Sequence, residues 1–388
     1  MKHILFLSIY YEPDLGAGSF RSVALVEELA KKLGNNGKVH VITTMPNRYQ
    51  SFKKEALAHE ERDNIVIDRV PMGAHKGGFV DQAVAYIHYY KGVKKITGNH
   101  SYNVVFATSQ RLFTSYLGLQ IAKKNRCPLY LDIRDLFVEN ITEIISNKLV
   151  SGILKPTLGI IEKMVFSKAN HINLVSEGFM VNFKKYKKPN FTFFTNGIDD
   201  IFIGLEKRDA LVNNPILITY AGNIGEGQGL EKIIPGIAAG LGSRFRIRVI
   251  GDGGTRKLLE DRIREEKIDN VEIIDPVKRD DLLSYYADSD YLFLHLNDYK
   301  AFEKVLPSKL FEYGASNIPI LGGISGYSAE FASEYISNIF LFKPCDVNSV
   351  VKFLQSNQYS LQKRDDFVSR FRRERISKEM ADSILSYL

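Results

Sequence analysis

A strand followed by a glycine-rich loop and a helix occurs twice in this chain of 388 residues. The first copy spans residues 4–33 and has Gly16 and Gly18 in its loop, while the second begins at residue 216 and carries four glycines between residues 222 and 229. Further apolar, strand-like runs alternate with helical stretches after each copy. Such alternation is typical of parallel, doubly wound sheets, whose ligands bind at the carboxyl ends of the strands. We therefore expect an α/β protein with two such sheets.

Length and charge limit the possible classes of protein. The length suits two ordinary domains, and 45% hydrophobic with 25% charged residues is typical of a soluble globular protein. The net charge of +7 fits an anionic partner, such as a nucleotide, a lipid diphosphate, a membrane surface or nucleic acid. Two distant cysteines, Cys127 and Cys345, support neither a disulfide framework nor a cysteine metal site. Without a signal-peptide pattern or a run of 18 apolar residues, we expect a cytoplasmic protein, with peripheral contact at the inner face of the plasma membrane left open.

Residues 291–323 read as a strand, a short helix and a second strand. Ser308 is a candidate N-cap of the helix, whose free N–H groups would suit a phosphate, and Lys309 adds a positive charge. Glu312 lies one turn further on the same face, where its carboxylate can accept two hydrogen bonds from a vicinal diol. Phosphate beside ribose describes a nucleotide. The alternative is an ordinary surface helix with a solvated lysine and glutamate.

The segment KVLPSKLFEYGASNIPIL, residues 304–321, resembles the donor-site segment of the family-four retaining glycosyltransferases of GT-B fold. Glu312 matches the family's second glutamate, which holds the ribose. The first glutamate of the family falls on Lys304, a departure that the neighbouring Glu303 could offset. The Pro-Ser-Lys version resembles a subgroup of bacterial surface-polysaccharide and O-antigen transferases. The resemblance implies the GT-B fold, with two facing Rossmann-like domains and a cleft between them.

The same resemblance implies a domain plan. Residues 1–199 would form the N-terminal acceptor domain, and residues 215–366 the C-terminal domain that binds the nucleotide-sugar. Residues 200–214 would be the linker, and a C-terminal helix at 367–388 would pack back on the N-terminal domain.

Donor-site residues carried over from the family lie in four segments of the second half. They are Gly222, Asn223, Gly225, Gln228, Gly253, Pro276, Val277, Ser308, Lys309, Leu310 and Glu312. Asn223 and Gln228 stand where the family has an arginine and a lysine that grip the donor diphosphate. We therefore expect Lys309 and Lys304 to supply the positive charge.

The first half supplies candidates for the acceptor and the reacting groups. Gly16, Gly18 and Arg21 match the loop that borders the acceptor side in the family, whereas the residues taken alone favour a tight structural turn. Arg134 and Asp135 follow a predicted strand, where the family has a histidine and an aspartate facing the transferred sugar. Arg134, Asp135 and Lys304 are therefore the candidate catalytic residues. The alternative for Arg134 and Asp135 is a salt bridge that holds a loop in place.

The resemblance implies a retaining hexosyltransferase that needs no metal and no cofactor. The expected donor is a nucleotide-sugar, with UDP favoured over GDP and an N-acetylated amino or deoxyamino sugar among the candidates. The expected acceptor is a glycan or a polyprenyl-diphosphate-linked glycan of bacterial surface polysaccharide, lipopolysaccharide or capsule, and no nucleic acid is expected as a partner.

Two other classes of function stay open. A nucleotide-sugar epimerase of the same fold would need an acid or base over the sugar, for which His295 and Glu303 are the candidates. A non-enzymatic basic protein could bind a membrane through residues 147–168, a lysine-rich apolar stretch that Pro156 and two glycines would interrupt. The lysines between residues 184 and 188 could bind nucleic acid, or form only a solvated helix end.

Overall fold

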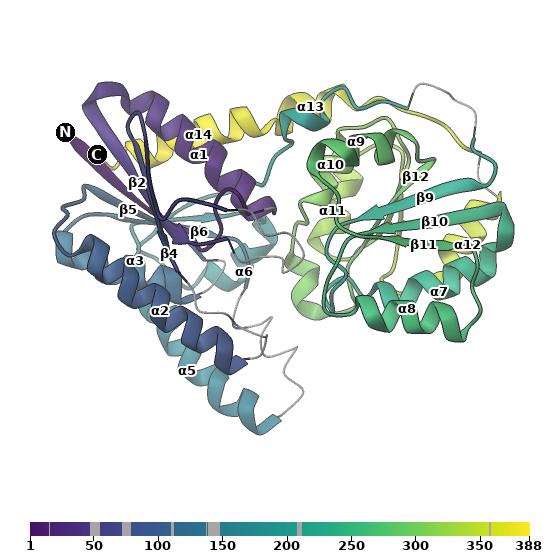
Figure 1. Ribbon diagram of the computed structural model, residues 1–388, viewed down its shortest axis with the longest axis horizontal. Coiled ribbons are helices and arrows are strands. Elements are labelled where there is room, and N and C mark those ends of the chain that lie inside the picture. Colours follow the sequence, from purple (N-terminus) through teal and green to yellow (C-terminus); the bar gives the residue numbers. More distant parts are fainter. Residues whose placement is uncertain are drawn as a thin grey trace. The chain divides into compact units, whose positions relative to one another are not determined.

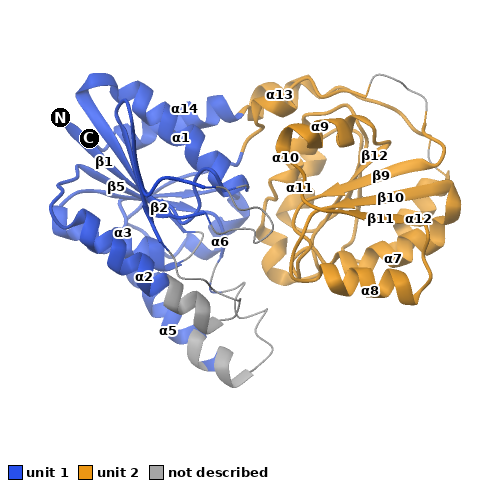
Figure 2. Ribbon diagram, in the orientation of Figure 1, with its two compact units in different colours: residues 1–196, 373–388 blue, residues 197–372 orange. Residues whose placement is uncertain are grey.

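The computed structural model describes residues 1–14, 16–46, 55–71, 79–109, 112–136, 138, 148–207, 212–356 and 358–388. The chain forms two compact units, residues 1–196 with 373–388 and residues 197–372 (Figure 2). Each unit has its own sheet of mainly parallel strands and its own apolar core. No helix in the described part of the chain has the length and apolar character needed to cross a membrane.

The sheet of the first unit has the order β3-β4-β2-β1-β5-β6-β7-β8 over the described residues, and only β3 is antiparallel to its neighbour. The strands are β1 (Lys2–Leu7), β2 (Gly37–Thr44), β3 (His59–Arg62), β4 (Ile65–Val70), β5 (Val104–Thr108), β6 (Leu129–Ile133), β7 (His171–Leu174) and β8 (Asn190–Thr192). The strand order reverses between β1 and β5, which makes the carboxyl ends of these strands the expected ligand position.

Helices cover both faces of this sheet. They are α1 (Ala17–Leu33), α2 (Phe79–Thr97), α3 (Leu112–Asn125), α5 (Lys148–Phe166), α6 (Met180–Phe183) and α14 (Arg373–Leu385), with short turns η1 (Gly34–Asn36) and η2 (Glu177–Phe179). Figure 1 shows α1 beside α14, and both pack on one apolar cluster that includes Leu29 and Met380. The helix α5 continues through Pro156, which corrects the expected interruption, because the buried Leu158 and Val165 hold it in place.

The sheet of the second unit is fully parallel and has the order β11-β10-β9-β12-β13-β14. Its strands are β9 (Ile216–Ala221), β10 (Phe245–Ile250), β11 (Val271–Ile274), β12 (Tyr291–His295), β13 (Ile320–Gly323) and β14 (Ile339–Phe342). The first and fourth strands in chain order, β9 and β12, are neighbours. This is the doubly wound order, in which ligands bind where the strand order reverses.

Apolar clusters fill both faces of the second sheet. Helices α7 (Leu230–Leu241), α8 (Arg256–Glu265) and α12 (Val347–Ser356) cover one face, and α9 (Arg279–Ala287), α10 (Lys309–Gly314), α11 (Tyr327–Tyr335) and α13 (Asp365–Phe371) cover the other (Figure 1). Short 3-10 turns lie at η3 (Asp200–Phe202), η4 (Gly242–Arg244) and η5 (Lys300–Lys304).

The boundary between the units lies at residues 196 and 197. Of the expected linker 200–214, residues 208–211 lie outside the described residues, and the rest packs on the second unit. Phe202 is 1% exposed in its core, and Lys207 forms a buried ion pair with Asp290 at 2.6 Å. At the other end, α13 belongs to the second unit and the chain joins the first unit at Arg373.

Candidate functional site

The loops that follow β9 and β10 touch each other through their backbones. Gly222 N donates to Ile250 O at 2.8 Å, and Ile224 N donates to Asp252 O at 2.9 Å. Gly251 has φ +148°, and a methyl group there would overlap Gly222 O. Gly253 has φ +157°, and a methyl group there would overlap Ile224 O. The glycines are therefore required by the packing of two loops at the carboxyl edge of the sheet.

Lys309 of α10 reaches this loop pair. A methyl group at Gly222 would overlap Lys309 Nζ, and the ammonium lies 5.4 Å from the centre of the Tyr220 ring. The structure thus brings Gly222 and Lys309 together, two residues that the sequence predicts to bind one diphosphate.

Asn223 and Gln228 bond to each other. Asn223 Nδ2 donates to Gln228 Oε1 at 2.7 Å, and the Tyr220 hydroxyl donates to Asn223 O at 2.6 Å. A methyl group at Gly225 would lie 2.5 Å from Asn223 Nδ2, so the missing side chain makes room for this pair. These neutral side chains give the loop its shape and bring no positive charge.

Ser308 lies at the N-cap position of α10, as predicted. The residue is itself helical, with φ −60° and ψ −27°, and its side chain makes no capping hydrogen bond. Its carbonyl instead accepts from Phe311 N at 3.0 Å. Leu310 is fully buried in the core, so only its backbone could meet a ligand.

The Glu312 carboxylate is partly buried, and no hydrogen bond or ion pair joins it to another of the described residues. Beneath it lie the buried Tyr286 and Tyr313. Burial raises the pKa of both phenols, and the negative charge of Glu312 raises the pKa further. A half-buried carboxylate over unionised phenols can accept hydrogen bonds from a ligand.

The other predicted donor-side residues lie in neighbouring loops. Pro276 and Val277 follow β11 and are partly exposed, and Val277 packs against the core. Lys304 ends the turn η5 and is partly exposed, and Glu303 beside it is exposed. The part of these residues in the site stays a prediction.

His295 at the end of β12 is fully buried. Its Nδ1 lies 2.6 Å from Gln228 O, which makes Nδ1 a donor, and Nε2 accepts from Cys345 N at 2.9 Å. Burial lowers the pKa of His295 to about 4, so the ring is neutral. Because both nitrogens bond to backbone, His295 holds two loops together and cannot act as the acid or base of an epimerase.

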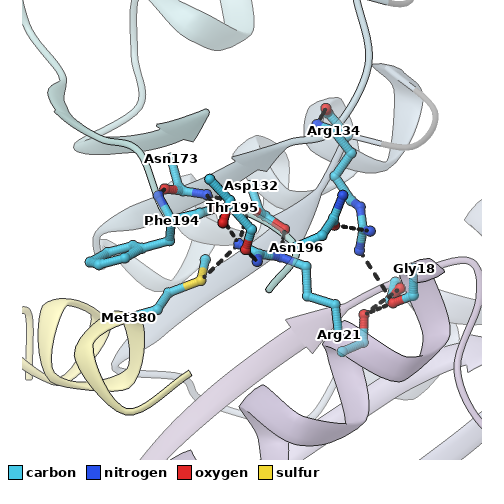
Figure 3. A network of polar contacts seen from close by, with 12 residues as sticks. Gly18, Arg21, Asp132, Arg134, Asn173, Phe194, Thr195, Asn196 and Met380 are labelled. Atoms are coloured by element: carbon cyan, nitrogen blue, oxygen red, sulfur yellow. Dashed lines mark hydrogen bonds and ion pairs between the residues drawn. The ribbon is translucent and has the colours of Figure 1, made fainter. Parts of the chain in front are cut away.

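In the first unit, Arg21 is the centre of a buried network (Figure 3). Its Nε donates to Asp132 Oδ2 at 3.1 Å, and its Nη2 donates to Phe194 O at 2.9 Å and to Met380 Sδ at 3.2 Å. Arg21 is 3% exposed. The buried guanidinium of Arg21 bonds within the fold, and the assignment of Arg21 to the acceptor site stays a prediction.

Arg134 lies against the first turn of α1. Its Nη1 donates to Gly18 O at 3.2 Å and its Nη2 to Asn196 Oδ1 at 3.1 Å, so neither of these acceptors is a carboxylate (Figure 3). Burial lowers the pKa of Arg134 to about 10, which leaves it charged. Gly16 precedes α1 and provides no side-chain cap, and Asp135 is exposed. Arg134 and Gly18 thus meet at the carboxyl edge of the first sheet.

Sequence reasoning missed three polar residues that shape these regions. Asn173 Nδ2 donates to Asp132 Oδ1 at 2.7 Å, Asn196 accepts from Arg134, and Tyr220 lies under Lys309. The signal for Tyr220 is its place, a large aromatic residue two positions before Gly222. Among the described residues, no group of three or more His, Cys, Asp or Glu side chains could hold a metal ion.

Part of the chain, within the second unit, resembles known sequences. Residues 205–370 match the family "Glycosyl transferases group 1". Over 124 residues the chain is 31% identical to WcaI of Escherichia coli K12, a protein named for glycosyl transfer in colanic acid biosynthesis. The matched stretch is 32% of this chain and 29% of that relative.

Solved structures match over the whole chain. Sucrose-phosphate synthase from Thermosynechococcus elongatus has a TM-score of 0.76 at 14% identity, covering 100% of this chain and 99% of the other. Anabaena HepE, solved with UDP and glucose, has a TM-score of 0.69 at 15% identity over 99% of both chains. WaaG, a glycosyltransferase involved in lipopolysaccharide biosynthesis, has a TM-score of 0.65 at 14% identity over 98% of this chain and 95% of its own. The predicted GT-B fold is confirmed, as is the resemblance to polysaccharide transferases.

Proposed function

We propose that this chain, a GT-B protein with a group 1 glycosyltransferase domain at residues 205–370, transfers a sugar from a nucleotide-sugar to a glycan or lipid-linked acceptor. The observation that carries the proposal is the pairing on α10 of Lys309, whose ammonium lies at Gly222, with the Glu312 carboxylate one turn further along. These groups stand at the carboxyl edge of the sheet, near the β9–β12 reversal. A cation and a carboxylate spaced in this way suit a diphosphate and a ribose.

In the proposed reaction, Lys309 stabilises the negative charge that develops on the departing nucleoside diphosphate, and Glu312 orients the ribose. The first unit takes the acceptor, with Gly16, Gly18 and Arg21 as the candidate contacts, and Arg134 is a candidate to contact the transferred sugar. Asp135 and Lys304 are the further candidates to contact the transferred sugar. The reaction proceeds with retention at the anomeric carbon, without a metal ion, and the acceptor hydroxyl passes its proton to the departing phosphate.

UDP is the proposed carrier, and the structure of HepE with UDP and glucose supports it. The names of WcaI and WaaG support an acceptor in bacterial surface polysaccharide, and a polyprenyl-diphosphate-linked glycan is the proposed form. We place the reaction in the cytoplasm at the inner face of the membrane. Exposed Ile160 and Met164 on α5, beside exposed Lys163, support a peripheral contact with anionic lipid.

Thermal unfolding with UDP, GDP, TDP and NAD tests the proposal on the wild-type protein and on Glu312→Ala. A ligand that binds only the folded state stabilises it by about 2.7 kcal/mol at a hundredfold excess over its Kd. We expect UDP to raise the melting temperature of the wild type and to have a much smaller effect on Glu312→Ala. If no nucleoside diphosphate shifts the transition, the proposed donor site is wrong.

A further inference from the structure

The first unit has an open cavity of about 850 Å³ between α1 and one face of its sheet. Its floor includes Ile65 and Ile67 of β4 together with Tyr11, and its walls include Glu27 and Ala30 of α1. This volume lies within the usual range for a pocket that holds a small molecule. Nothing in the proposed transfer reaction uses these residues.

The cavity extends from the loop that follows β1 to the amino edge of the sheet. Tyr11 lines it at one end, and Gly37 and Ile65, the first residues of β2 and β4, line it at the other. Gly18 and Arg134 meet at the carboxyl edge and are not among its lining residues. The cavity is therefore separate from the place where the strand order predicts the reacting groups.

Hydrogen bonds hold both ends of the cavity in place. At the amino edge, Asn64 Nδ2 donates to Ala30 O at 2.8 Å, which ties the segment before β4 to the last turns of α1. At the other end, Arg69 Nη2 donates to Glu12 O at 3.1 Å and fixes the loop that carries Tyr11. The cavity is thus a formed part of the unit, and a ligand would not have to open it.

The Tyr11 phenol is a buried polar group in this cavity. Tyr11 is 3% exposed, yet no hydrogen bond joins its hydroxyl to another residue in the described part of the chain. Burial raises the pKa of the phenol, and the negative charges of Glu12 and Glu27 raise it further. The phenol therefore keeps its proton and lies near both carboxylates. A buried hydroxyl without a partner costs free energy, which a ligand that accepts its hydrogen bond would recover.

Charged groups of both signs surround the phenol. Glu27 forms no ion pair with the rest of the described chain, so its carboxylate oxygens can accept hydrogen bonds from a ligand. Glu12 is paired with Arg62, with Oε1 and Nη1 2.6 Å apart. Lys38 lines the amino edge and likewise has no ion-pair partner among the described residues. A strongly cationic ligand would be repelled by Arg62 and Lys38, and a strongly anionic one by the two carboxylates.

We infer that this cavity binds a neutral oligosaccharide, with sugar hydroxyls that donate to Glu27 and accept from Tyr11. A sugar hydroxyl can do both, and the C–H groups of a sugar ring suit the apolar floor of Ile65 and Ile67. The inference goes beyond the proposed function, because it gives the first unit a carbohydrate-binding site that does not depend on the nucleotide site of the second.

Calorimetric titration of the full chain with maltotriose, cellotriose, mannotriose and triacetylchitotriose tests the inference. We expect at least one of these neutral trisaccharides to bind, and we expect Tyr11→Phe and Glu27→Gln each to weaken that binding about tenfold. Glu28→Gln is the matched control, since Glu28 is the next residue of α1 and does not line the cavity. It should keep the affinity of the wild type.

The stability of Tyr11→Phe without sugar is a second measurement. The substitution removes only a hydroxyl that has no hydrogen-bond partner among the described residues, so the variant should melt at the temperature of the wild type. A clearly lower melting temperature would show that the hydroxyl is bonded within the fold, and would overturn the inference.

The remaining outcomes are equally decisive. The inference is wrong if no trisaccharide binds, or if one binds equally well to the wild type, Tyr11→Phe and Glu27→Gln. Spermidine and inorganic phosphate are the charged probes: tighter binding of spermidine that Glu27→Gln abolishes, or of phosphate that Lys38→Gln abolishes, would make this an ion site instead. Glu312→Ala should bind the trisaccharide as the wild type does, so failure of the proposed nucleotide site would leave this inference standing.

Discussion

The guanidinium of Arg21 and the carboxylate of Asp132 form an ion pair inside the first unit, with Nε and Oδ2 3.1 Å apart and both side chains at most 4% exposed. Removal of one partner of a buried pair leaves the other charge without compensation, which costs about 3–5 kcal/mol. We expect Arg21→Met to lower the free energy of unfolding of the first unit by this order, as measured by urea titration with circular dichroism.

The exposed pair Lys32–Asp382, at 2.7 Å, is the control for this prediction. Asp382→Asn should cost about 0–1 kcal/mol, the usual value for a surface ion pair. If Arg21→Met is as stable as the wild type but binds acceptor poorly, Arg21 belongs to the acceptor site after all.

Glu312 should distinguish ribose from deoxyribose. A hydrogen bond to a charged group contributes about 1.5–3 kcal/mol, so the wild type should bind UDP about 10- to 100-fold more tightly than 2′-deoxy-UDP. Glu312→Ala should bind both ligands with similar, weak affinity in calorimetric titration. Glu303→Ala, at an exposed position on η5, should keep the discrimination, and a Glu312→Ala variant that keeps it would contradict the proposed contact.

Gly251 should tolerate no side chain. Its φ of +148° and the nearby Gly222 carbonyl make Gly251→Ala costly by about 1–3 kcal/mol, with a lower melting temperature. Gly254→Ala is the matched control, because a methyl group at Gly254 would meet no atom within 4 Å. Equal melting temperatures for the two variants would show that the contact between the two loops is not tight.

The buried His295 should make the second unit sensitive to acid. Its pKa is lowered to about 4 by burial, whereas the unfolded chain has the ordinary value near 6.5. Below pH 6.5 the unfolded state binds the proton first, so stability falls as the pH drops from 6.5 to about 4, by roughly 3 kcal/mol in total. In His295→Gln this contribution is absent, and urea titrations across that range should show a shallower pH dependence. If the stability of His295→Gln falls with pH as steeply as that of the wild type, a group other than His295 causes the pH dependence.

The alternation of apolar runs and glycine loops was sufficient to predict two doubly wound sheets, because local periodicity determines these elements. Lys309 at the loop of Gly222 was expected from the family resemblance, because Asn223 and Gln228 replace the family's cations there and Lys309 was the expected substitute. The burial of Arg21 did not follow: its partners Asp132, Phe194 and Met380 are distant in the chain and meet only in the folded unit.

The ends of the units and of the helices were harder to predict than the presence of the helices and strands. Residues 200–207 were expected to begin a linker, yet Phe202 enters the core of the second unit and Arg279 pairs with Asp199 at 2.5 Å. Ser308 has the residue type of an N-cap, but its backbone is already helical. In both segments the contacts made in the folded unit, which are not visible in the local sequence, decide the structure.

The return of α14 to the first unit determines the order in which the protein can be completed on the ribosome. Residues 1–196 emerge first, but Met380, Ala381 and Ile384, which are almost fully buried in the core beside α1, are made only after the whole second unit. Domains generally fold as units during synthesis, N-terminal first. Here the unit that begins first is finished last. The apolar surface along α1 therefore stays exposed until the second unit has been translated and α14 can pack on it.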